Sequence, residues 1–206
     1  MPSTRTWRLL GKSSPTLFVA SGMLLLVQVI LIGLRRYEIS SFSDSWIALS
    51  SIPAVIAGLI ALIGLCPQFS HEAPTLARFA AAAAASAGML LCAAAAWLIG
   101  ISLRGGPPQP LPAWFLGVIA AFMIAFMLGF ILSAAASFTT GRRFSGWLLL
   151  VPVFAWGSIL VAGVMTNMNG ALRLDFYTNG AIACAFIALG LGSARKAAAS
   201  KHIGQL

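Results

Sequence analysis

The chain has 206 residues, of which 60% are hydrophobic and 8% are charged, and its mean hydropathy is +0.95. Soluble domains carry about a quarter charged residues, so a soluble fold of this length could not cover its surface. The net charge of +9 comes from basic residues set singly or in pairs between apolar runs, which is typical of membrane topology signals and not of nucleic-acid binding. We expect a single integral membrane domain over residues 1–206, with the lipid bilayer as its partner and no nucleic acid.

Six apolar runs in the chain are long enough to cross a bilayer. The first follows Arg5, Arg8 and Lys12, as in a signal peptide, but its length of about 28 Å as a helix is enough for the hydrocarbon core. We therefore expect it to be retained as a transmembrane helix. The sequence predicts an all-α, multi-pass transmembrane bundle of about six helices, with spans at residues 16–34, 46–66, 76–100, 114–138, 147–165 and 176–194.

The distribution of basic residues predicts the orientation of the bundle. With the N-terminus inside, the inner segments hold nine Lys and Arg and the outer loops hold four. The positive-inside rule then puts both termini on the cytoplasmic side of the inner or plasma membrane. The aromatic residues Trp46, Trp114, Trp147 and Tyr177 fall at span ends, where amphipathic rings favour the headgroup level.

Small residues recur every four positions in three of the runs, and such stripes allow close helix contact in lipid. We expect these stripes at helix–helix contacts inside the bundle, or at contacts with other membrane subunits or a second copy of the chain. The stripes are Ala80, Ala84, Gly88, Cys92, Ala96 and Gly100; Gly117, Ala121, Ala125, Gly129, Ser133 and Ser137; and Gly180, Cys184, Ala188 and Gly192.

Groups that support catalysis or hold cofactors are scarce in the spans. No Asp, Glu, His, Lys or Arg lies near a span centre, where such residues mark proton relays and ion paths. Haem between helices needs axial ligands, and zinc needs about three or four. The cysteines Cys66, Cys92 and Cys184 lie singly in apolar runs. We expect no metal, no haem or other cofactor, and no catalytic residue.

A few polar residues and prolines interrupt the apolar runs. Gln28 is the lone polar side chain deep in the first run, and we expect it to bond to a neighbouring helix. The alternative is a site where Pro53 and Pro152 open the backbone of two helices. The acids Asp44, Glu72 and Asp175 stand near predicted helix starts, where carboxylates cap free N–H groups.

The remaining polar residues gather on the predicted outer side. We hypothesise that they form a polar pocket for a ligand with an anionic or carbonyl group, such as a lipid headgroup. The alternative is a set of solvated loops with weak surface ion pairs. The candidate ligand-binding residues are Arg35, Arg36, Glu38, Asn167, Asn169, Arg173 and Asn179.

Three classes of function follow from these patterns. The first is transport, or binding of a small molecule or lipid, at an outer polar vestibule. The second is a non-catalytic structural or accessory subunit of a membrane complex. The third, with the weakest support, is a lipid-modifying enzyme that uses Glu38, Asp44 or Asp175.

Overall fold

The computed structural model describes residues 4–36, 44–102, 111–166 and 169–203. Over these ranges the chain is helical, and each α-helix contains a segment long and apolar enough to cross a membrane. The predicted all-α bundle of six spanning helices is therefore confirmed. The helices are α1 (Thr4–Arg36), α2 (Asp44–Leu65), α3 (Pro74–Ser102), α4 (Ala113–Thr139), α5 (Arg143–Thr166) and α6 (Asn169–Ile203), with a short 3₁₀ helix, η1 (Cys66–Phe69), after α2.

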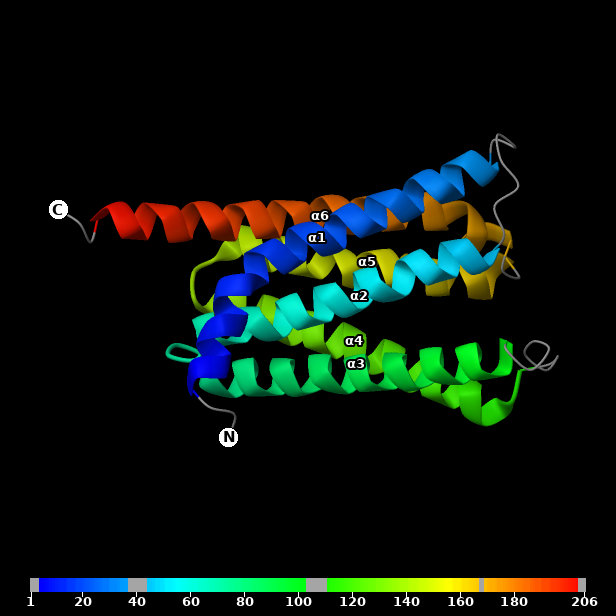
Figure 1. Ribbon diagram of the computed structural model, residues 1–206, viewed down its shortest axis with the longest axis horizontal. Coiled ribbons are helices and arrows are strands. Elements are labelled where there is room, and N and C mark those ends of the chain that lie inside the picture. The colour runs from blue at the N-terminus through cyan, green and yellow to red at the C-terminus, as the bar shows by residue number, and fades with distance from the viewer. Residues whose placement is uncertain (1–3, 37–43, 103–110, 167–168, 204–206) are drawn as a thin grey trace.

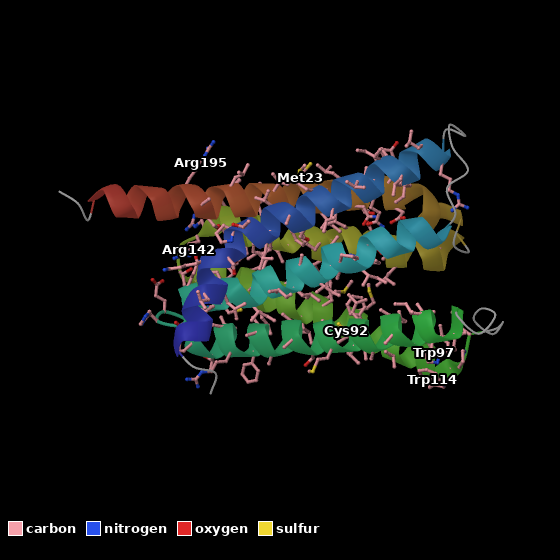
Figure 2. The ribbon with its side chains drawn as sticks, in the orientation of Figure 1. Met23, Cys92, Trp97, Trp114, Arg142 and Arg195 are labelled. Carbon is pink, nitrogen blue, oxygen red and sulfur yellow. The ribbon has the colours of Figure 1, made fainter. Side chains whose placement is uncertain are left out.

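The six helices form a closed ring. Each contacts the next helix along the chain, and α6 contacts α1. Figure 1 shows the helices side by side along the long axis of the molecule, with α1 beginning and α6 ending at the same end. We call the half of the bundle at this end the terminal half and the other the far half. Figure 2 shows Arg142 and Arg195 in the terminal half, and Trp97 with Trp114 at the opposite end. The cytoplasmic location of the terminal half stays a prediction.

A glycine ends α4 and shapes the turn into α5. Gly141 has a φ of 70°, and the N–H of Arg142 donates to the Ser137 carbonyl at 2.8 Å, as in a Schellman helix end. The turn brings Arg142 to η1. There its guanidinium donates to Gln68 Oε1 at 2.7 Å and lies 5.6 Å from the centre of the Phe69 ring. This contact ties the two connections of the terminal half together.

Helix α1 is hydrogen-bonded to α2 in the terminal half and near the middle of the bundle. The Ser14 hydroxyl donates to the Ala61 carbonyl at 2.7 Å, and the Ser21 hydroxyl donates to the Ala54 carbonyl at 2.6 Å. Both serines are fully buried. Hydroxyls of this kind link transmembrane helices because lipid offers them no other partner.

Glycines allow α1 to approach both of its neighbours. A Cβ on Gly64 of α2 would lie 2.5 Å from the Leu10 carbonyl oxygen, and a Cβ on Gly190 of α6 would lie 2.5 Å from the Pro15 carbonyl oxygen. Both contacts are with backbone atoms, which cannot move aside as a side chain can. Any larger residue at either position would push the helices apart, so these two glycines fix the position of α1.

The predicted small-residue stripes are only partly correct. Ala80 and Ala84 are buried, whereas Cys92 is exposed, and Gly180 and Gly192 have no neighbour within 4 Å where a Cβ would stand. A helix has 3.6 residues per turn, so a repeat of four drifts about 40° at each step and leaves the contact face. The buried alanines of α3 instead follow steps of three, four and seven, namely Ala77, Ala80, Ala84, Ala87 and Ala94.

Helix α6 corrects one sequence-based interpretation. It begins at Asn169 and not near residue 176, so Asp175 lies inside the helix, and the predicted role of Asp175 as a cap is wrong. The polar residues Thr178, Asn179 and Gly180 lower the hydropathy at the start of the run, so hydropathy alone does not reveal the first two turns of the helix. The capping roles of Asp44 and Glu72 stay predictions.

Candidate functional site

The predicted outer pocket is described only in part. Arg35 is exposed in the last turn of α1, and Asn179 is buried in α6. Glu38 and Asn167 lie outside the described residues, and so do the side chains of three further candidates, Arg36, Asn169 and Arg173. The pocket as a set of seven residues therefore stays a prediction. Of the two members whose side chains are described, Asn179 is buried and Arg35 is exposed.

The predicted pocket requires two helix ends to be neighbours, and the structure meets this requirement. The end of α1 must lie beside the start of α6, and a Cβ on Gly33 would stand 3.1 Å from the ring of Phe176. The two helices are also in contact along their length. The ends of α1 and α6 that carry the candidate residues are therefore neighbours.

A cavity of about 260 Å³ lies in the far half, deeper than the predicted pocket. All six α-helices contribute to its wall, so it lies on the axis of the ring. Its polar lining consists of Gln28, Ser51, Asp175 and Asn179. Neither Pro53 nor Pro152 is among the described residues that line it, so the expectation of a site built on broken helices is not met here.

Two of the polar residues form a pair on α6. Asn179 Nδ2 donates to Asp175 Oδ1 at 2.5 Å, which is possible because residues four apart lie on the same helix face. Asn179 is 5% exposed. The hydrogen bond uses one carboxylate oxygen, and the structure records no donor among the described residues for the other oxygen of Asp175.

Gln28 of α1 lines the same cavity as this pair. It is 7% exposed, and its Oε1 has no hydrogen-bond partner among the described residues. The expected bond from this oxygen to a neighbouring helix is therefore absent from the part of the chain that the structure describes. A buried polar atom without a partner costs about 1–3 kcal/mol, so the Gln28 oxygen is a site where a ligand donor would be favoured.

The rest of the cavity wall is apolar and rich in aromatic rings. Phe126 of α4 has its ring centre 5.8 Å from that of Phe122 and 6.5 Å from that of Trp156. Phe186 of α6 completes the aromatic lining. A wall of this kind opposite a polar wall is typical of sites that hold small molecules.

Sequence reasoning missed this site for a specific reason. The sequence pattern favours a helix cap for Asp175 and a helix–helix contact for Gln28. Neither interpretation predicts that the two residues line one cavity. Two spacings in the sequence carry the signal. Asp175 and Asn179 are four residues apart, and Ser14, Ser21 and Gln28 are seven apart. The second spacing puts three polar side chains on one face of an apolar helix.

The chemical groups needed for a metal centre do not gather in the part of the chain that is described. Within it, no three His, Cys, Asp or Glu residues lie close enough to hold a metal ion. Cys66 is buried, whereas Cys92 and Cys184 are exposed. The cavity therefore offers hydrogen bonds, one carboxylate and aromatic surface, which suit the binding of an organic molecule.

The comparisons with known proteins add no family to this description. No family model, no curated protein and no solved structure matches the chain.

Proposed function

We propose that this protein binds or transports a small amphipathic molecule that occupies the cavity of the far half. The observation that carries the proposal is that Gln28, whose buried side-chain oxygen has no donor among the described residues, lines the cavity. Bound ligand would supply the missing donor and offset the cost of the unpaired atom.

The shape of the cavity supports a small ligand. A volume of about 260 Å³ lies just below the range of about 300–1,000 Å³ that is usual for drug-sized ligands. Its aromatic wall suits an apolar body, and its polar wall suits a single head group. A small free molecule, or the polar end of a lipid, fits a cavity with one aromatic wall and one polar wall.

The proposal includes an orientation, in which the cavity lies toward the outer side of the membrane. The nine-to-four distribution of basic residues supports it. Topology reporters fused after Lys12, Arg143 and Lys201 should report a cytoplasmic location, and a fusion after Pro108 an external one. An external signal at Lys201 would overturn the orientation of the C-terminus.

The access of a small molecule to the cavity can be measured with cysteine chemistry. In a variant with Cys66, Cys92 and Cys184 replaced by Ala, Ser51→Cys should react with neutral methyl methanethiosulfonate. The control is Leu59→Cys, on the same helix but in the packed core at 2% exposed. We expect Ser51→Cys to react at least about tenfold faster, since it lines a cavity and Leu59 does not. Equal, slow rates at the two positions would contradict the proposal.

A structural or accessory subunit is the second candidate function, and one feature favours it. Gly88 and Gly100 of α3 have no neighbour among the described residues within 4 Å at the Cβ position, and Cys92 between them is exposed. Such a face suits contact with another transmembrane helix. Mild oxidation of membranes should then give a covalent dimer through Cys92 that is absent in Cys92→Ser. Failure to form this dimer would count against a copy-to-copy contact on α3.

The lipid-modifying enzyme has the least support. An acid–base mechanism would need two carboxylates in one cleft. Among its described lining residues the cavity holds one, Asp175.

A further inference from the structure

We infer that the ligand of the far-half cavity is a small organic cation, a primary or secondary ammonium on an apolar body. The inference rests on the proposed binding function and adds the charge and head group of the ligand. It comes from three properties of the cavity wall, namely a carboxylate, two oxygens that have no donor among the described residues, and an aromatic surface.

The carboxylate gives the cavity its charge preference. Asp175 lies within a span of α6 that covers Leu174–Arg195 and lines the cavity. No ion pair of Asp175 is recorded among the side chains that the structure describes. A carboxylate that is partly withdrawn from water near the end of a membrane span is costly unless it is paired. A cationic ligand would supply the pairing charge, whereas an anionic ligand would be repelled.

The hydrogen-bonding capacity of the wall points to a donor. Gln28 Oε1 has no partner among the described residues, and Asp175 uses one oxygen to accept from Asn179. Gln28 on α1 and Asp175 on α6 both line the cavity. An ammonium group carries up to three N–H donors and no acceptor, so it suits a wall that offers acceptor oxygens.

The aromatic wall adds attraction of the same sign. Phe122, Phe126, Trp156 and Phe186 line the cavity, and aromatic faces attract cations through their quadrupole. The helix dipoles do not oppose this preference. Three helices begin and three end in the far half, so their partial charges cancel around the ring.

The experiment compares three probes of nearly one shape. They are 2-phenylethylammonium, neutral propylbenzene and anionic 3-phenylpropanoate. Each is tested for its ability to slow the methyl methanethiosulfonate reaction of Ser51→Cys in the full chain with Cys66, Cys92 and Cys184 replaced by Ala. We expect the cation to protect at a concentration at least about tenfold lower than propylbenzene, since it gains a charge-assisted hydrogen bond, and we expect the anion not to protect.

Variants connect this preference to the named groups. Asp175→Asn should remove the advantage of the cation over propylbenzene, and Gln28→Met should reduce it about threefold, as the loss of one hydrogen bond would. The control is Thr178→Val, which is buried on α6 but bonds to carbonyls of its own helix and should leave the advantage unchanged. If Asp175→Asn does not fold, Gln28→Met provides the test.

The outcomes separate the two proposals. Reaction at Ser51→Cys with equal protection by cation and neutral probe, or with best protection by the anion, would overturn the cation inference and leave the binding function standing. An advantage that survives both Asp175→Asn and Gln28→Met would also overturn the inference. No reaction at Ser51→Cys above the Leu59→Cys rate would overturn the binding function itself.

Discussion

Helix α1 carries three buried polar side chains at seven-residue spacing, and the two halves of the bundle treat them differently. Ser14, in the terminal half, and Ser21, near the middle of the bundle, each donate to a backbone carbonyl of α2. Gln28, in the far half, has an oxygen without a partner among the described residues and borders a cavity. Seven residues make almost two helical turns, so all three lie on nearly one face. The difference must come from the neighbouring helices.

The surroundings of α1 differ along the bundle. In the terminal half Gly64 and Gly190 allow direct contact between backbones, and near the middle Gly22 of α1 lies close to an α6 carbonyl. At this level the ring of Phe186 packs against α1 and α2 and also lines the cavity. Gln28, further along α1, lines the same cavity.

The largest expected effect tests the close packing of the terminal half. Gly190→Leu should lower the free energy of unfolding by more than about 3 kcal/mol, because overpacking against backbone cannot relax. Gly192→Leu is the matched control on the same helix, where no atom lies within 4 Å of the Cβ position. Unfolding in mixed detergent micelles measures both. Similar losses at the two positions would mean that the contact of Gly190 with Pro15 does not hold α1.

The next effect concerns the contact between α3 and α4. A Cβ on Gly129 would stand 3.3 Å from the Ala84 backbone nitrogen, so Gly129→Leu should cost about 2–3 kcal/mol of stability through overpacking. Leu128→Ala, at a neighbouring position that is 47% exposed, should cost less than about 1 kcal/mol, as exposed positions do. The same micelle assay applies, and a cost at Leu128 equal to that at Gly129 would remove the support for this contact.

A smaller effect is expected at Ser21. Ser21→Ala removes the hydroxyl that donates to the Ala54 carbonyl and should lower stability by about 1 kcal/mol, the usual value of one hydrogen bond between helices in a membrane. Ser158→Ala is the control, because the Ser158 hydroxyl bonds within its own helix to the Ala155 carbonyl. If the two variants lose the same stability, the bond between α1 and α2 adds nothing specific.

The smallest effect on stability is expected at Gln28. It distinguishes this residue most directly from Ser21 on the same helix face. Gln28→Leu should leave the free energy of unfolding unchanged or raise it by up to about 1 kcal/mol, because it removes a buried polar atom without a partner. The sign is opposite to that for Ser21→Ala on the same helix face. A loss of 1 kcal/mol or more would mean that Gln28 is a structural contact, as the sequence alone suggests.

The positions of the spans could be predicted because length and hydropathy are local properties. The predicted runs fall within the six helices apart from Cys66 at the end of the second, which lies in η1. Errors occurred where polar residues sit inside a helix. The first turns of α6 contain Arg173 and Asp175, and a hydropathy rule begins the span after them. Asp175 was therefore assigned to a cap when it lies on the wall of a cavity.

Length and hydropathy are enough to predict about six membrane-spanning helices, because few charges and long apolar runs leave no other way to cover the surface. The buried face of each helix, and the partner of each buried polar group, depend on how the helices pack against one another. Ser21 and Gln28 look alike in the sequence as polar residues on one apolar helix. The surroundings separate them: Ser21 reaches the Ala54 carbonyl of α2, whereas Gln28 lines a cavity whose wall includes residues of α2 and α6, far away in the chain.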